Sequence, residues 1–127
     1  MLVLVTEDDI EYAEIIAEAV RHESHEVVIA GSVNGALRFA RNGMPQLAIL
    51  DVMLPDGSGL DVARELRRQS PDLPIIFLTN MDRPGDVAAG FDAGADDYVT
   101  KPFHPGELVA RGRAACRAAG RARRRAD

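Results

Sequence analysis

The 127-residue chain lacks most of what would mark a secreted or membrane protein. It has a single cysteine, Cys116, so no internal disulfide can form, which is typical of a reducing compartment. No apolar run approaches the roughly 20 residues of a membrane span. Met1 leads straight into Leu-Val-Leu-Val, without the basic n-region or the cleavage site of a signal peptide. We therefore expect no signal peptide, no membrane association and a cytoplasmic location.

Lysine is nearly missing as well: Lys101 is the only lysine, beside 14 arginines.

The net charge of −5 hides a strong asymmetry. Residues 1–110 carry 8 basic and 19 acidic side chains, whereas residues 111–127 carry seven arginines and one aspartate. A basic segment can bind nucleic acid, but this one has no aromatic residues for base stacking and no second helix to enter a groove. We interpret it as a solvated helix end and linker.

Short apolar runs alternate with helical patterns along the chain. Runs rich in β-branched residues predict strands, and apolar residues at helical spacing predict helices. The expected strands are residues 2–6, 26–30, 47–51, 75–79 and 97–100, and the expected helices begin near residues 10, 32, 58, 84 and 105. Gly112 and Gly120 interrupt the last helix, so its C-terminal turns are expected to fray.

This alternation indicates an α/β domain with a parallel sheet covered on both faces. Right-handed crossovers and five strands favour a flavodoxin-like, doubly wound sheet of order 2-1-3-4-5. We expect one domain over residues 1–118, followed by an Arg-rich C-terminal tail or linker over residues 119–127. In such sheets the functional crevice lies outside the carboxyl ends of the strands, between strands 1 and 3.

Polar residues stand where the apolar strands end, and each one alone is more often a loop starter or a helix cap. Because parallel strands all end at one edge, these side chains are expected to meet there. They are Glu7 and Asp8 after the first strand, Asp51 at the end of the third, Thr79 at the end of the fourth and Lys101 after the fifth.

Carboxylates crowded at one edge repel one another, and a divalent cation would relieve the repulsion. Oxygen ligands without a His/Cys cluster favour Mg²⁺ over Ca²⁺ or Mn²⁺. Mg²⁺ commonly binds carboxylates together with phosphate oxygens, so we expect a phosphoryl group beside Asp51. Lys101 would offer it an ammonium group and Thr79 a hydroxyl. A carboxylate can accept a phosphoryl group covalently, so the hypothesis is that Asp51 becomes an aspartyl phosphate.

Four segments resemble the receiver domain of two-component response regulators, across roughly residues 1–118. They are residues 4–9, 50–59, 77–79 and 94–103. The resemblance implies that Asp51 is the phosphoacceptor for a sensor histidine kinase. It also implies that Mg²⁺ is held by Glu7, Asp8, Asp51 and the backbone carbonyl of Met53.

The resemblance further implies a conformational switch. Thr79 and Tyr98 resemble the pair that reorients when phosphate binds, and Lys101 resembles the phosphate-binding lysine. The bond between Lys101 and Pro102 is expected to be cis. An aromatic residue on a short edge strand is more often simple packing, which is the alternative for Tyr98. We favour a ring that moves inward on phosphorylation.

Residues 103–111 resemble receivers attached to winged-helix DNA-binding domains. Those receivers pair through the fourth helix, fifth strand and fifth helix, which implies a homodimer on phosphorylation. The implied interface candidates are Asp96, Asp97, Glu107 and Arg111. DNA would then be contacted only through an effector domain that is not part of this chain.

Two departures from that subfamily are visible. Val87 stands where a basic residue usually partners the acid at Glu107, so one ion pair across the dimer is expected to be absent. Asn80 and Met81 replace the small and basic pair that is common after the threonine, which leaves the dephosphorylation rate open.

Three alternative functions share parts of this pattern. A stand-alone receiver would dock a partner protein or relay phosphate. A Mg²⁺-dependent phosphatase would also use Asp51 as nucleophile, but such enzymes place a second acid two residues later, where this chain has Met53. A flavin carrier needs a hydroxyl-rich phosphate loop after the first strand, where Glu7 and Asp8 would repel the phosphate. We favour a signalling switch that controls transcription and is not a conventional enzyme.

Overall fold

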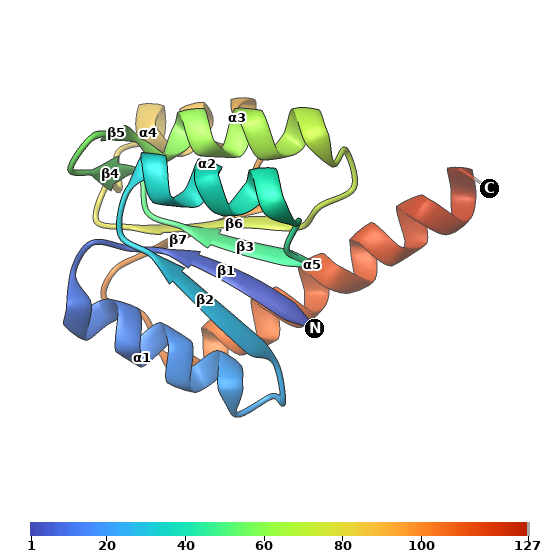
Figure 1. Cartoon of the computed structure of the whole chain (residues 1–127), viewed down its shortest axis with the longest axis horizontal. Helices are drawn as coiled ribbons and strands as arrows, with labels where there is room; N and C mark the ends of the chain where they lie inside the picture. The colour runs from blue at the N-terminus through green and yellow to red at the C-terminus, as the bar shows by residue number, and fades with distance from the viewer. Residues whose placement is uncertain (127) are drawn as a thin grey trace.

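A parallel sheet forms the centre of the molecule (Figure 1). The computed structural model describes residues 1–126, with side chains through residue 122. Over these residues the sheet has five strands in the order β2-β1-β3-β6-β7, which is 2-1-3-4-5 when they are counted alone, so the predicted topology is confirmed. The strands are β1 (Leu2–Thr6), β2 (Glu26–Ala30), β3 (Leu47–Leu50), β6 (Ile75–Thr79) and β7 (Asp97–Thr100).

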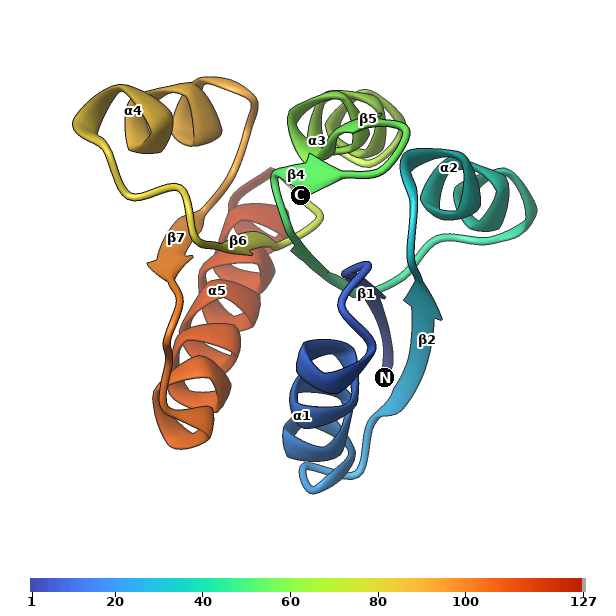
Figure 2. The ribbon, with the colours of Figure 1, turned by 90° about the vertical axis from the view of Figure 1, so that its left-hand side faces the viewer.

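Helices cover both faces of the sheet (Figure 2). Helices α1 (Ile10–Arg21) and α5 (Pro105–Ala126) lie on one face. Helices α2 (Val33–Asn42), α3 (Gly59–Gln69) and α4 (Pro84–Asp92) lie on the other. Between β3 and α3, the two-residue strands β4 (Met53–Leu54) and β5 (Gly57–Ser58) form an antiparallel hairpin that the sequence patterns did not predict.

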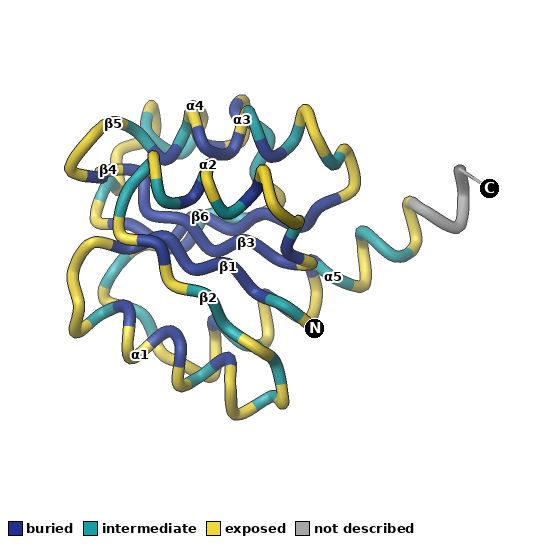
Figure 3. The backbone as a smooth tube through the Cα atoms, in the orientation of Figure 1, coloured by how far each residue is buried: buried dark blue, intermediate teal, exposed yellow. Residues whose placement is uncertain are grey.

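Side chains alternate along the strands into two separate cores. In β6, Ile75 and Phe77 join the core beneath α2 and α3, while Ile76 and Leu78 join the core beneath α1 and α5. All four are essentially fully buried, and the central strands are buried along their length (Figure 3). Because both faces of the sheet are covered, the central strands β1, β3 and β6 are apolar apart from the threonines that end β1 and β6, instead of alternating with polar residues.

Local hydrogen bonds fix where two helices begin. The Ser32 hydroxyl accepts from the backbone N–H of Gly35 at 3.0 Å, and the Ser58 hydroxyl accepts from that of Leu60 at 3.0 Å. Both serines are therefore N-caps, and each satisfies one of the unpaired amides at a helix start. Pro84 opens α4, as predicted.

Helix α5 is continuous in the structure, and the expected fraying of its C-terminal turns stays a prediction. It runs without a break from Pro105 to Ala126 and projects beyond the sheet (Figure 1). The expected domain boundary at residue 118 falls inside this helix and stays a prediction, and Asp127 lies outside the described residues. No helix in residues 1–126 combines the length and the apolar character needed to cross a bilayer.

Gly59 allows helix α3 to approach the backbone of Asp51. Its N–H donates to the Val52 carbonyl at 2.7 Å. A Cβ atom at this position would lie 1.9 Å from the Asp51 carbonyl oxygen, which no side chain tolerates without movement of the backbone. The glycine therefore fixes the distance between α3 and the end of β3.

Gly59→Ala should lower the free energy of unfolding by about 1–3 kcal/mol, because the methyl group forces the backbone of Asp51 away from α3. The matched control is Gly85→Ala at the start of α4, where nothing lies within 4 Å of an added Cβ, and it should be neutral or slightly stabilising. Urea denaturation compares the three proteins. A wild-type midpoint for Gly59→Ala would contradict the close approach.

Candidate functional site

The backbone ladder of the sheet carries the predicted site residues to one edge. The Asp51 N–H donates to the Thr6 carbonyl at 2.9 Å, and the Lys101 N–H donates to the Thr79 carbonyl at 2.8 Å. The residues at the strand ends are therefore held in register across neighbouring strands. Glu7, Asp51, Thr79 and Lys101 line a common cavity of about 280 Å³, which Asp8 and Met53 also line.

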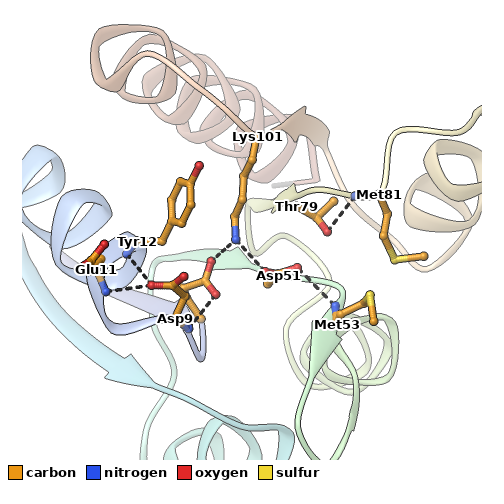
Figure 4. A network of polar contacts seen from close by, with 9 residues as sticks. Asp9, Glu11, Tyr12, Asp51, Met53, Thr79, Met81 and Lys101 are labelled. Carbon is orange, nitrogen blue, oxygen red and sulfur yellow. Dashed lines mark hydrogen bonds and ion pairs between the residues drawn. The ribbon is translucent and has the colours of Figure 1, made fainter.

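Lys101 bridges two of the acids. Its ammonium donates to Asp51 Oδ2 at 2.9 Å and to Glu7 Oε1, and its side chain is only 3% exposed (Figure 4). Burial by itself lowers the pKa of Lys101, but the hydrogen bonds and charges of Glu7 and Asp51 outweigh it and raise the pKa above its ordinary value. The lysine is therefore charged at neutral pH. The bond from Lys101 to Pro102 is cis, as predicted.

Glu7 and Asp51, which contact this cation, form an acidic cluster with Asp8. Each offers one carboxylate oxygen, and these oxygens lie within 4.8 Å of one another. Burial raises the pKa of Glu7 and the charge of Asp51 adds to the rise, while hydrogen bonds from Lys101 and from the Asp9 backbone offset it only in part. The donors are all hard oxygens, so the set fits a cation such as Mg²⁺.

The loop that follows Asp51 is tied to helix α2. Asp51 Oδ1 accepts from the N–H of Met53 at 3.2 Å. At the turn of the β4–β5 hairpin, the carboxylate of Asp56 accepts from the backbone N–H groups of Asn34 at 2.9 Å and Val33 at 2.7 Å. These two bonds lower the pKa of Asp56. The sequence predicted the turn but not this cap, because the bonded residues are more than 20 positions apart.

Met81 lies between the two predicted switch residues. Its N–H donates to Thr79 Oγ1 at 3.3 Å, and its carbonyl accepts from the Tyr98 hydroxyl at 2.6 Å. The Tyr98 ring packs against Phe77, with centroids 5.9 Å apart, and over Gly90, where a Cβ would come within 2.7 Å of it. Tyr98 is thus packed and also connected to the site. Its burial raises the pKa of its hydroxyl, and nearby carboxylates add to the rise.

The interface candidates make ion pairs within the chain. Arg111 donates to Asp97 and to Glu107, each at 3.0 Å. Asp96, just before β7, pairs instead with Arg67 at 3.1 Å, and its carboxylate accepts from the N–H of Ile75, the first residue of β6, at 2.8 Å. The triad of Arg111, Asp97 and Glu107 remains partly exposed.

Asp9 and Tyr12 also line the cavity, and the sequence interpretation did not select them. Asp9 is the N-cap of α1, with Oδ1 accepting from the N–H groups of Glu11 at 3.0 Å and Tyr12 at 3.3 Å. An aspartate just before an apolar helical period is a capping signal. That signal would have placed Tyr12 in the first turn, beside the acids.

A doubly wound domain with a buried aspartate, two further acids, a hydroxyl and a lysine at its carboxyl edge defines a class of signalling domain. The chain belongs to the response regulator receiver domain family, whose sequence model matches residues 3–113. The resemblance drawn from the four sequence segments is thereby confirmed.

Similar proteins agree with this assignment. The chain is 47% identical over 118 residues to the "Probable transcriptional regulatory protein TcrX" of Mycobacterium tuberculosis, covering 93% of this chain and 50% of that protein. It is 44% identical over 115 residues to the "DNA-binding response regulator MtrA" of Mycolicibacterium paratuberculosis, covering 91% and 51%. The chain spans about half the length of the curated relatives it matches. The solved "BeF3 Activated DrrB Receiver Domain" superposes with a TM-score of 0.83 at 32% identity, covering 90% and 95%.

Lys101→Met should lower the free energy of unfolding by about 3 kcal/mol without divalent metal, because Glu7 and Asp51 are left buried and unpaired. Excess Mg²⁺ should raise the melting temperature of this variant more than that of the wild type, since no ammonium then competes for the same oxygens. Thermal unfolding with EDTA or with Mg²⁺ measures both effects.

The matched control is Arg38→Met, which removes an exposed cation on α2 and should leave the response to Mg²⁺ at the wild-type level. Equal Mg²⁺-induced shifts for wild type and Lys101→Met would contradict competition between the ion and the ammonium.

Proposed function

We propose that this receiver is a phosphorylation-dependent switch in which Asp51 accepts a phosphoryl group from a sensor histidine kinase. The observation that carries the proposal is the carboxylate of Asp51, 8% exposed and held between the Lys101 ammonium and the Met53 N–H at the edge of a cavity. The names of the relatives, a transcriptional regulatory protein and a DNA-binding response regulator, support an output in transcription.

The transfer forms one bond and breaks another. A carboxylate oxygen of Asp51 attacks the phosphorus of a phosphoimidazole, and the P–N bond breaks with its electron pair leaving on the imidazole nitrogen, which takes a proton from water. The Lys101 ammonium offsets the negative charge on the phosphoryl oxygens, and the Thr79 hydroxyl supplies a further donor. Hydrolysis of the acyl phosphate returns the carboxylate, so the domain is a phosphoacceptor that assists its own reactions and not a conventional enzyme.

Mg²⁺ is the cofactor that the acidic cluster suits best. Glu7, Asp8 and Asp51 would hold it through their carboxylates, with the Met53 carbonyl as a further oxygen ligand. When bound, the ion supplies positive charge for the phosphoryl oxygens in a site that is otherwise rich in carboxylates.

The peptide of Met81 connects phosphate binding to the surface. If the Thr79 hydroxyl turns to a phosphoryl oxygen, it no longer accepts from the Met81 N–H. The Met81 carbonyl holds the hydroxyl of Tyr98, so a movement of this loop is passed to the ring that packs over Gly90 of α4. The ring is already half-buried, and the proposal is that phosphorylation draws it further inward.

The surface formed by α4, β7 and α5 would then mediate a homodimer. Arg111, Asp97 and Glu107 are exposed enough to exchange partners with a second copy. Val87 offers no cation to the partner's acid, so such a dimer depends on Arg111 more than on helix α4.

Incubation with Mg²⁺ and acetyl phosphate should add one phosphoryl group, because an acyl phosphate is a small-molecule donor for the same attack. Mass spectrometry should show the adduct on the wild type and none on Asp51→Asn. Asp61→Asn, which changes an exposed acid on α3, is the control and should be phosphorylated normally. An undiminished adduct on Asp51→Asn, or none on the wild type, would end the proposal.

Addition of BeF3 and Mg²⁺ should shift the protein toward a dimer in sedimentation equilibrium. Arg111→Ala should weaken that dimer by up to about tenfold, since partly exposed ion pairs contribute little each. Arg64→Ala on α3 is the control and should dimerise like the wild type. A monomer under all conditions would instead favour a stand-alone receiver.

A further inference from the structure

Tyr12 lies against the ammonium group of Lys101 at the rim of the site. The distance from Lys101 Nζ to the centroid of the Tyr12 ring is 4.4 Å, which is within the range of a cation–π interaction (Figure 4). The ring also contacts Phe103, with centroids 6.0 Å apart and planes inclined by 35°. The ring of Tyr12 therefore contacts both a neighbouring aromatic side chain and a buried charge.

The turn that supplies the acids also fixes the position of Tyr12. Asp9 accepts from the Tyr12 N–H at 3.3 Å, and the Asp9 N–H donates to Glu7 Oε2 at 3.1 Å. Glu7 and Tyr12 are thus the two ends of one capped turn, and both contact the ammonium of Lys101. Their geometry relative to the lysine is set together.

Lys101 has to change partners if the site works as proposed. An ammonium has three N–H donors, and Glu7 and Asp51 accept from it here. A phosphoryl group on Asp51 and a cation shared by Glu7 and Asp51 both alter these acceptors. A lysine side chain is long and flexible, so it can leave the site when its acceptors change. The ring of Tyr12 is a contact that this exchange does not remove.

We propose that Tyr12 is a positioning residue that keeps the ammonium of Lys101 directed at the phosphoryl group while the carboxylates exchange partners. This role deepens the proposed function and rests on it. The contact is made by the aromatic face, so phenylalanine should replace tyrosine and leucine should not. Leucine preserves an apolar contact with Phe103, which keeps α1 packed.

The sequence offers a clean reporter, because Lys101 is the only lysine. Protein labelled with ¹³C-lysine gives one set of side-chain NMR signals, and protons over an aromatic face are shielded. The ε-methylene protons of Lys101 should be shielded in the wild type and in Tyr12→Phe, both before and after phosphorylation by acetyl phosphate with Mg²⁺. In Tyr12→Leu they should move to the position of an unshielded lysine.

The second readout is the rate of phosphoryl incorporation at Asp51. Tyr12→Leu should be slower by several-fold, up to about thirtyfold, which corresponds to the range of buried cation–π contacts. Tyr12→Phe should react at close to the wild-type rate, and thermal unfolding confirms that both variants fold.

Two results would overturn the positioning role: a wild-type rate for Tyr12→Leu, or a Tyr12→Phe variant as slow as Tyr12→Leu. A wild-type protein that takes up no phosphoryl group would overturn the proposed function itself, and the role of the ring with it. The lysine signals of the unphosphorylated variants distinguish that case, because they report the contact of ring and ammonium without any transfer.

Discussion

The ammonium of Lys101, buried between Glu7 and Asp51, is the interaction on which the carboxyl edge of the sheet depends. A side chain that follows β7 reaches acids at the ends of β1 and β3 only because the parallel strands stay in register to their last residues. Two buried carboxylates this close would otherwise repel each other strongly. The contact that stabilises the resting domain is also the one that a metal ion and a phosphoryl group would have to rearrange.

Hydrogen bonds between side chains and backbone groups connect this edge to the rest of the molecule. The peptide of Met81 joins Thr79 to Tyr98, and the carboxylate of Asp56 joins the loop after Asp51 to the first turn of α2. Both connections involve loops at the carboxyl ends of strands, where the chain is least constrained by the sheet. If Asp51 is phosphorylated as proposed, a rearrangement there would therefore reach α2 and α4 through these loops.

Much of this arrangement could be predicted from the sequence, because the apolar runs of β3 and β6 stop at polar residues and one topology brings those ends together. The short-range caps of α2 and α3 were predictable for a similar reason, since cap and helix are adjacent in the chain. The bonds of Asp56 to α2 and the position of Tyr12 over Lys101 were not, because they depend on how a hairpin and a helix turn are placed in three dimensions. The expected fraying of α5 stays a prediction, because it concerns how often the last turns open and not whether residues 105–126 form a helix.

Helix α5 is 22 residues long, about 33 Å at the standard rise. Its first turns pack on the sheet, and its C-terminal part extends past it. Because the helix is continuous, tilting its base by a few degrees would move its far end as the end of a lever moves. Each residue turns the helix by about 100°, so inserting or deleting one residue would rotate the following helical residues by that angle. The number of residues in α5 therefore determines both how far its end lies from the sheet and in which direction that end faces.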